Sequence, residues 1–416
     1  MKRISGHPYT RRGFVSLMAG IPLVGKLNTL AAKAASGGFP AKSEFEIKGT
    51  YINAAYTHPM SKGCRNEINQ FLNDRMLNRT NPSGYDAHER ATVKANFSRL
   101  INAGADEIAL VPSTMVGENL VISGLSLRES KSRIVTDAFH FHGSLHLYNQ
   151  LAKEGLDIEV VKPRQNIIDL NDLDAAIKPG TRLVALSLVS STTGYLHDLK
   201  KVCNLAHARG AYVYADIIQA AGTMPIDVKA SGVDFCATAT YKWLMGDFGV
   251  GFLYVRKDRL PEMKRTMIGY RQIASSSQHF LPFETPGKKP FESESKEDMS
   301  GHFEVGTFAS GAIAPLHYSL PYFLNAGPDK IQQYRQPMID YLQDELPKHG
   351  FLPLTPVHSP SPIVCFAFRD AEKLLKPKLD AADIDISVYE HMIRISPSIY
   401  NDMEDVKKLA ATLRPK

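Results

Sequence analysis

The sequence has few cysteines and no hydrophobic run long enough to cross a membrane. Its four cysteines (Cys64, Cys203, Cys236 and Cys365) are far apart and form neither a CxxC pair nor a metal-type spacing. No apolar run approaches the roughly 20 residues of a membrane-spanning helix, so the mature chain is expected to be soluble. Internal repeats and low-complexity arrays are also absent. Cys236 and Cys365 lie in apolar strand-like runs and are expected to be core residues.

Acidic residues are missing altogether from residues 1–35. This stretch holds six basic residues, and the pattern TRRGFVS at 10–16 leads into an apolar segment. A basic segment, an apolar segment and then the small residues AAKAA at 31–35 are typical of a twin-arginine (Tat) export signal that is removed on maturation. The alternative is a disordered basic arm that binds an anionic partner. The order of the three parts favours the signal and predicts a periplasmic protein.

The positive net charge of the chain comes from this leader. The formal net charge is +6, and residues 1–35 carry six positive and no negative side chains. The rest of the chain is therefore formally neutral. The basic pI of about 8.9 thus gives no indication of nucleic-acid binding.

Short apolar runs alternate with helix-like segments through the middle of the chain. Strands are expected at 106–113, 132–139, 181–190, 211–216, 233–240 and 250–258, and helices at 114–125, 143–155 and 199–210. Val-, Ile- and Leu-rich runs that alternate with helices predict an α/β fold with a mostly parallel sheet, flanked by helices on both faces. In such sheets ligands bind beyond the carboxyl ends of the strands.

The chain is expected to divide into the leader at 1–35, an N-terminal arm at 36–80, a large domain at 81–311 and a smaller C-terminal α/β domain at 312–416. Residues 260–300 are rich in Ser, Pro, Lys and Glu. They are expected to form a long surface loop, a partner-contacting arm or a lid.

Polar residues follow several of the expected strands. They are Ser113 and Thr114 at a helix start, the run 190–194, Asp216 with Gln219 one helical turn on, and Thr240, Tyr241 and Lys242. Taken singly, each could be a solvated strand end or a helix cap. Together they fit one chemistry. An aldehyde cofactor needs a lysine amine for a Schiff base, a carboxylate for its ring nitrogen and donors for its phosphate.

The span ADIIQAAGTMPIDVKASGVDFCATATYKWLMGDFGVGFLYV (215–255) resembles the cofactor-binding core of class V aminotransferase-fold enzymes, which use pyridoxal 5′-phosphate (PLP). Similarity extends to SLVSSTTG (187–194), FEVGT (303–307) and IRISPSIYNDMEDV (393–406). The group includes cysteine desulfurases, kynureninases and isopenicillin N epimerase-like proteins. The resemblance implies PLP fold type I, with a large α/β domain, a smaller C-terminal domain and a homodimer.

The resemblance also implies roles for individual residues. Lys242 is expected to be the Schiff-base lysine and general base, Asp216 the partner of the pyridine nitrogen, and Arg394 the bidentate partner of the substrate carboxylate. The expected phosphate contacts are Ser113, Thr114, the backbone of Met115, Tyr241 and, across the dimer interface, Thr307. Gln219 is expected at the phenolic oxygen or the Schiff-base region, Ser191 near a cofactor oxygen, and Thr240 at the cofactor without a more specific role. Asn53 and Ala54 are expected to line the substrate pocket.

The stretch FHFHGSLH (139–146) is expected to supply the ring that stacks on the cofactor, with Phe141 preferred and His140 second. A metal site formed by His140, His142 and His146 is an alternative, because HxH places two imidazoles on one side of a strand. Only Asp137 accompanies these histidines, so no metal is expected.

The sequence departs from the family pattern at four places, and these departures bear on which activities of the family to expect. The segment LDAADIDISVYEHMIRIS lacks the cysteine that desulfurases carry there, and Gln219 stands where kynureninases have histidine. His302 replaces a frequent arginine, which leaves that contact open. Ser191 replaces a common asparagine, which leaves its hydrogen bond to the cofactor open. Desulfurase and kynureninase activities are therefore not expected.

The resemblance then implies a PLP enzyme that acts at the α-carbon of an amino acid, or of an amino-acid-like group in a peptide or secondary metabolite. An aminotransferase is favoured. An epimerase or lyase is the alternative, and a catalytically idle binding protein of this fold is a further one. Exported family members resemble periplasmic enzymes that tailor the glutamate side group of pyoverdine siderophores, which suggests siderophore tailoring. Expected partners are a small-molecule or peptide amine, a second copy of the chain and the Tat machinery, without nucleic acid or, after processing, a membrane.

Overall fold

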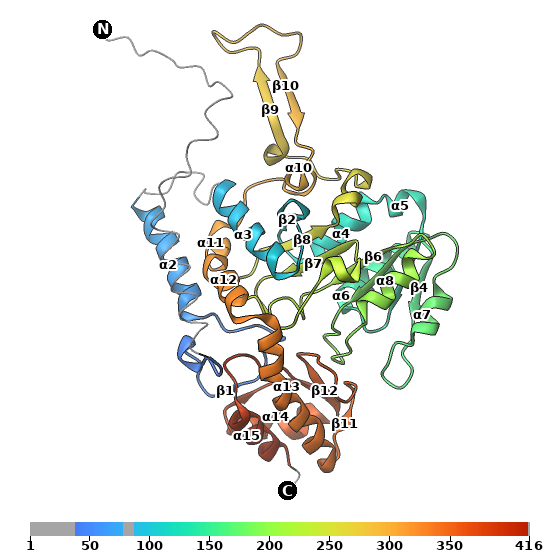
Figure 1. Cartoon of the computed structure of the whole chain (residues 1–416), viewed down its shortest axis with the longest axis vertical. Coiled ribbons are helices and arrows are strands. Elements are labelled where there is room, and N and C mark those ends of the chain that lie inside the picture. The colour runs from blue at the N-terminus through green and yellow to red at the C-terminus, as the bar shows by residue number, and fades with distance from the viewer. Residues whose placement is uncertain (1–37, 78–86, 415–416) are drawn as a thin grey trace.

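A seven-stranded sheet forms the centre of the large domain in the computed structural model, which describes residues 38–77 and 87–414 (Figure 1). In spatial order its strands are β2 (Ile108–Val111), β8 (Gly251–Val255), β7 (Phe235–Ala239), β6 (Tyr212–Asp216), β5 (Thr181–Ser187), β3 (Arg133–Asp137) and β4 (Ile158–Val161). Strands β7, β6, β5, β3 and β4 are parallel, and β8 runs antiparallel to both of its neighbours. The α/β fold with a mostly parallel sheet is confirmed.

Helices cover both faces of this sheet. The helices of the large domain and its N-terminal flank are α2 (Lys62–Met76), α3 (Ala87–Leu100), α4 (Thr114–Gly124), α5 (Leu127–Ser130), α6 (His142–Lys153), α7 (Leu170–Ala176), α8 (Leu199–His207), α9 (Val228–Ser231), α10 (Met299–Phe303), α11 (Ser310–Ile313) and α12 (Leu316–Ala326). One apolar core joins α3, α8 and α12 to one face, and a second joins α4 and α6 to the other. Strands buried on both faces explain why their sequences are continuously apolar.

The C-terminal domain packs below the large sheet in the view of Figure 1. Its helices are α13 (Pro328–Glu345), α14 (Ala371–Ala381) and α15 (Met403–Leu413). Its antiparallel sheet has the order β11 (Leu352–Pro353), β12 (Val364–Ala367), β15 (Met392–Ile395) and β14 (Ser387–Tyr389). The N-terminal segment adds β1 (Thr50–Tyr51), which pairs in parallel with β13 (Ile384–Asp385) and so ties residues near the start of the described chain to this domain.

A hairpin projects from the large domain where the sequence led us to expect a long loop, an arm or a lid (Figure 1). Strand β9 (Ile273–Gln278) pairs antiparallel with β10 (Phe291–Ser295). The expectation of a loop is wrong for the residues of these two strands. Their backbones form a regular hydrogen-bonded strand pair, although nearly all of their side chains are exposed. The arm and lid interpretations remain predictions.

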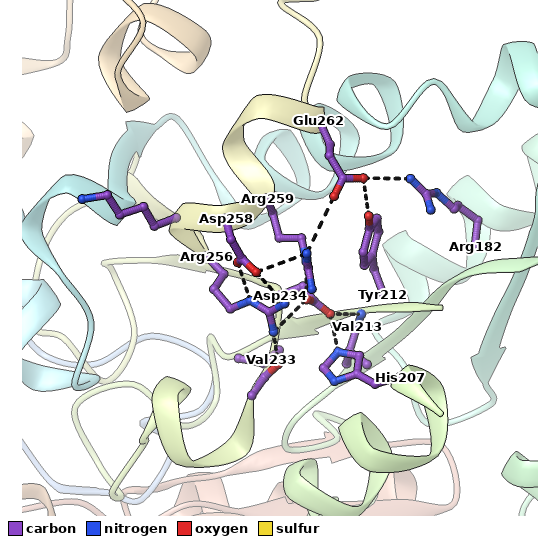
Figure 2. Close-up of polar contacts among 12 residues, drawn as sticks. Arg182, His207, Tyr212, Val213, Val233, Asp234, Arg256, Asp258, Arg259 and Glu262 are labelled. Atoms are coloured by element: carbon purple, nitrogen blue, oxygen red, sulfur yellow. Dashed lines mark hydrogen bonds and ion pairs between the residues drawn. The ribbon is translucent and has the colours of Figure 1, made fainter. Parts of the chain in front are cut away.

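Asp234 forms a buried ionic cluster at the amino-terminal edge of the sheet, immediately before β7 (Figure 2). Its carboxylate is completely buried and lies 2.9 Å from Arg259 Nε and 3.1 Å from Arg256 Nη1. It also accepts the backbone N–H of Val213 and lies 2.7 Å from His207 Nε2. One carboxylate thus connects the beginnings of β6 and β7 to the segment that leaves β8.

Candidate active site

A cavity of about 220 Å³ lies at the carboxyl ends of the parallel strands, on the edge of the sheet opposite Asp234. Its lining residues come from separate strand ends and helix starts of the large domain. They are Ser113, Thr114, Met115, Phe141, Ser187, Val189, Ser191, Asp216, Ile218, Gln219, Ala239, Tyr241 and Lys242. Nine of the residues predicted from the sequence to contact a cofactor are therefore brought together at one place.

Lys242 reaches this cavity from the turn that follows β7. The side chain is buried, and the whole residue is 8% exposed. The pKa of Lys242 is lowered from 10.5 to about 8, chiefly by burial and also by the nearby charge of Arg394, while the charge of Asp216 acts in the opposite direction. Burial disfavours the charged ammonium form, so a substantial fraction of this amine is neutral and nucleophilic near neutral pH.

This lowered pKa predicts an unusual labelling profile for Lys242 in cofactor-free protein. Because only the neutral amine reacts, acylation by a small anhydride should be half-maximal near pH 8 rather than near 10.5. Competitive labelling across pH 6–11, followed by peptide mass spectrometry, measures the midpoint. A midpoint above about pH 10, as for an ordinary lysine, would contradict the prediction.

Asp216 is the last residue of β6 and is 3% exposed. Its Oδ1 accepts the backbone N–H of Ile218 at 2.9 Å, which fixes the orientation of the carboxyl group. The pKa of Asp216 is raised from 3.8 to about 6, chiefly by burial, although the hydrogen bond from Ile218 and the nearby Lys242 act to lower it. At neutral pH Asp216 is therefore mostly a carboxylate, beside a cavity that also holds the Lys242 amine.

The N-terminus of α4 forms another wall of the cavity. Ser113 caps this 11-residue helix by accepting the N–H of Val116 at 3.3 Å. The hydroxyl of Thr114 is buried and has no hydrogen-bond partner, although Thr114 lines the cavity. A buried hydroxyl without a partner is rare, and helix N-termini attract anions. Ser113, Thr114 and the backbone of Met115 thus fit a phosphate group.

Phe141 lines the cavity, whereas its neighbour His140 does not. His140 is 2% exposed and turns into the protein, where it contacts Ser187 and Glu118. The preferred candidate for the ring beside the cofactor therefore lies at the cavity. The second candidate, His140, faces away from it because consecutive residues before α6 point in opposite directions.

Gln219 and Tyr241 are held in place by their neighbours. The carboxamide of Gln219 donates to the carbonyl of Ala55 at 3.1 Å and accepts from Trp243 Nε1 at 2.8 Å. The ring of Tyr241 stacks on Phe248 with centroids 4.5 Å apart. Both side chains therefore enter the site with a fixed orientation.

A second, larger cavity of about 680 Å³ adjoins the first and shares Phe141, Ser191, Tyr241 and Lys242 with it. Its other lining residues are Ala55, Tyr56, Thr57, His142, Thr192, Phe248, Tyr389, Met392 and Arg394. Both domains contribute to this wall, since Arg394 lies on β15 of the C-terminal domain.

The guanidinium of Arg394 is held in position but keeps free donors. Nη1 donates to the carbonyl of Ser191 at 2.9 Å, and Nη2 donates to the hydroxyl of Ser387 at 2.9 Å. Nε is buried and has no hydrogen-bond partner. A guanidinium carries five N–H groups, so an incoming carboxylate can still be bound by two of them.

Four other predicted residues lie outside both cavities, and one of them, Ala54, is completely buried next to Ala55, which lines the larger cavity. The Asn53 side chain bonds to Asp385 and accepts from Ser387, so it supports the residue that holds Arg394. Thr240 donates to the carbonyls of Asp247 and Val250 and so fixes the turn after Lys242. Thr307 is exposed, near the hydroxyl of Tyr270, and its role across a dimer interface remains a prediction. The side chains of Asn53 and Thr240, which were expected to contact a ligand, instead make hydrogen bonds within the protein.

Several lining residues were not predicted. Ser187 lies three residues before the polar run 190–194, and Tyr56, Phe248 and Tyr389 are aromatic residues of turns or strand ends. Ser187 was missed because the expected strand continued to residue 190, whereas β5 ends at Ser187. The aromatic residues carry no comparable signal, because only the packing of the two domains brings them together.

The described part of the chain, 38–77 and 87–414, contains no group of three or more His, Cys, Asp or Glu residues that could hold a metal ion. Within the same ranges no helix is long and apolar enough to cross a membrane. All four cysteines are buried and free, and none of them lines either cavity. The expected twin-arginine signal at 1–35 lies outside the described residues.

The family model described as aminotransferase class-V matches residues 66–409. A probable cysteine desulfurase of Methanothermobacter thermautotrophicus is 29% identical over 298 residues, which cover 70% of this chain and 71% of that protein. An uncharacterized aminotransferase of Schizosaccharomyces pombe is 26% identical over 379 residues, which cover 88% of this chain and 91% of that protein.

Two solved structures share the fold. The cysteine desulfurase CsdA of Escherichia coli superposes with a TM-score of 0.75 at 21% identity, over 90% of this chain and 97% of that one. A lysine-to-alanine mutant of C-DES, with glycine covalently linked to its PLP cofactor, gives a TM-score of 0.76 at 20% identity, over 88% of this chain and 96% of that one.

Proposed function

This chain belongs to the class V aminotransferase family, and from that premise we propose that it is a PLP-dependent aminotransferase acting on an α-amino-acid group. The observation that carries the proposal is one continuous site with Lys242 and Asp216 at one end and Arg394 at the other. An amine of lowered pKa, a buried carboxylate and a guanidinium with free donors are the groups needed to bind the cofactor and an amino-acid substrate.

The residues of the smaller cavity fit the cofactor. PLP supplies an aldehyde that bonds to a primary amine and a protonated ring that withdraws electrons from the α-carbon. Asp216 would hold the proton on the ring nitrogen, and the unpartnered hydroxyl of Thr114 at the start of α4 would bind the phosphate. Phe141 would pack against one ring face.

The chain's own residues would then hold the substrate and move its proton. Arg394 would bind the α-carboxylate, which places the α-carbon toward Lys242. Lys242, whose lowered pKa of about 8 makes the neutral amine accessible near neutral pH, would take the α-proton as a general base. Return of that proton to a different atom gives transamination, and return to the opposite face of the same carbon gives epimerisation.

A lyase is the second candidate, and the relatives named cysteine desulfurase favour it. A desulfurase that carries sulfur on its own thiol is not supported, because none of the four cysteines lines the site. Cys365 is the register partner of Arg394 across β12 and β15, and burial raises the pKa of its thiol to about 12. That thiol stays protonated and poorly nucleophilic at neutral pH.

Incubation with single amino-acid donors in deuterium oxide tests these alternatives. Stoichiometric conversion of bound PLP to pyridoxamine phosphate by at least one donor is expected. Deuterium at the α-carbon without conversion would favour an epimerase, and release of a keto acid with ammonia or sulfide would favour a lyase. Failure of the protein to bind PLP would instead support the idle binding protein.

The proposal also includes export through the Tat pathway and tailoring of a peptide siderophore in the periplasm. It is supported by TRRGFVS at 10–16 and by the acid-free leader. Substituting lysine for both Arg11 and Arg12 should retain the full-length chain in the cytoplasm, as measured by cell fractionation. Unchanged periplasmic accumulation of that variant would contradict the assignment of a twin-arginine signal.

A further inference from the structure

The outer part of the site is larger than a small amino acid needs, and aromatic side chains are frequent in its wall. The cavity that holds Arg394 measures about 680 Å³, against about 220 Å³ for the adjoining cofactor cavity. Cavities of roughly 300–1,000 Å³ take ligands of drug size. Five of its 13 lining residues are Phe or Tyr, whereas Phe, Tyr and Trp make up 9% of the chain. The proposed reaction gives a role to Arg394 and Lys242 but none to the outer aromatic residues.

Three of these aromatic residues, here named the outer rings, are exposed to solvent. Tyr56 is 65% exposed, Phe248 is 61% exposed and Tyr389 is 44% exposed. They come from three segments: a turn after β1, a turn between β7 and β8, and the end of β14. Single exposed aromatic side chains are ordinary, but a group of them around one cavity is typical of a surface that a ligand covers.

One of the outer rings is already ordered without a ligand. Phe248 stacks on Tyr241, with ring centroids 4.5 Å apart and planes 21° apart. The Tyr241 ring in turn lies 5.8 Å from Lys242 Nζ and lines both cavities. An aromatic surface that begins beside the reactive amine is therefore fixed in advance, which lowers the entropic cost of binding to it.

A second aromatic surface continues from Arg394. Met392 and Arg394 are two residues apart on β15, so their side chains point to the same face. Tyr389 is the direct partner of Met392 in the antiparallel register with β14 and shares that face. Two residues along a strand cover roughly 7 Å. A side chain of a few carbon atoms thus reaches Met392 and Tyr389 from a carboxylate held by Arg394.

The charges of the cavity do not match an acidic or basic substrate side chain. Among the described residues no Asp or Glu lines this cavity, so a second ammonium group would meet no carboxylate. Arg394 and Lys242 serve the α-carboxylate and the α-amine, which leaves His142 as the one further basic side chain of the wall. Burial of an unpaired charge is costly, so an uncharged side chain fits best.

We propose that the substrate carries a planar aromatic ring on the side chain of its α-amino-acid group, and that the outer rings bind it. The inference rests on the proposed function, because that function fixes which end of the substrate meets Arg394 and Lys242. Aromatic rings gain from offset stacking and edge-to-face contacts beyond the area that they bury. A cavity that accepts any apolar group of the same size is the competing explanation.

The test uses carboxylates that lack the α-amine, so that binding to the PLP-loaded protein is measured without reaction. 3-Phenylpropionate carries the planar ring, 3-cyclohexylpropionate a saturated ring of the same carbon count, and propionate and glutarate no ring. Calorimetry should show that 3-phenylpropionate binds the wild type at least about tenfold more tightly than propionate or glutarate. It should also bind about fivefold more tightly than 3-cyclohexylpropionate. Hydrophobicity alone gives the reverse order for these two, because the saturated ring is the more apolar.

Phe248→Leu removes a ring but keeps an apolar side chain. It should bind 3-phenylpropionate and 3-cyclohexylpropionate about equally and leave the affinity for propionate unchanged, because Arg394 is untouched. Tyr389→Leu should show the same loss from the other domain, so that a folding defect in one variant does not decide the result. Phe280→Leu is the matched control: Phe280 is 65% exposed, lies in the turn of the β9–β10 hairpin and lines neither cavity. It should keep the wild-type preference.

A separate readout tests the proposed function, namely conversion of bound PLP to pyridoxamine phosphate by phenylalanine, alanine or glutamate. Preferred binding of 3-phenylpropionate without conversion by any donor would overturn transamination and support the ring site. Conversion together with tighter binding of glutarate or 3-cyclohexylpropionate would overturn the ring site alone. A full preference in both Phe248→Leu and Tyr389→Leu, or an equal loss in Phe280→Leu, would also overturn it.

Discussion

Lys242→Ala should lower turnover by on the order of 10³-fold or more with any substrate that the wild type accepts, because the proposed function uses one amine as both cofactor anchor and general base. Lys242 is the lysine that lines both cavities, and burial keeps it partly neutral. The variant should still bind PLP through Thr114 and Asp216, but without a covalent bond. Borohydride reduction followed by peptide mass spectrometry should locate the cofactor on Lys242 in the wild type and on no lysine in the variant.

A surface lysine provides the control for this experiment. Lys201 pairs with the neighbouring Asp198, and its side chain is 64% exposed, so Lys201→Ala should leave turnover unchanged. Added methylamine should restore part of the activity of Lys242→Ala by supplying the missing base. Retention of more than a tenth of wild-type turnover by Lys242→Ala would exclude the assigned role.

Asp234→Ala should be the most destabilising substitution at the opposite edge of the sheet. It removes the carboxylate shared by Arg256, Arg259, His207 and the backbone of Val213. Breaking a buried ion pair in this way typically costs about 3–5 kcal/mol, and partial exposure of the two arginines places the expected loss near the lower end, about 3 kcal/mol. Denaturant unfolding of the cofactor-free protein, followed by circular dichroism, measures the loss.

Asp258→Ala tests whether the large stability loss expected for Asp234→Ala arises from the burial of its carboxylate. Asp258 contacts the same two arginines, but its side chain is 60% exposed, so its removal should cost less than about 1 kcal/mol (Figure 2). Below its unfolding temperature, Asp234→Ala should keep wild-type turnover, because Lys242 lies past the other end of β7. Equal effects of the two substitutions would show that Asp234 is not the centre of the cluster.

The large sheet was predictable because its strands carry a strong local signal. Strands β2, β3, β5, β6, β7 and β8 are apolar and buried on both faces, which gives continuous hydrophobic runs. Strand β4 escaped prediction because it lies at the sheet edge and most of its residues are partly exposed. The β9–β10 hairpin escaped because exposed Ser and Glu residues give no apolar alternation.

The chemistry of the site was predictable for a different reason. In a parallel sheet the carboxyl ends of strands meet at one edge, so Asp216 and Lys242 had to approach each other once their strands were recognised. Glu118 was not predictable in this way. A single acid within the apolar helix TMVGENLVISG is a weak signal until its partner, His140, is known.

The sequence by itself determined the fold class, the family, the lysine–aspartate pair and the helix start at Ser113, because each depends on residue order within one or two adjacent elements. Only the tertiary structure decided that Phe141 rather than His140 faces the cavity and that Asn53 supports Arg394 through Ser387. It alone also connected Glu118 to the edge of the site. Side-chain direction and contacts between distant segments follow from packing, and local sequence does not encode packing one residue at a time.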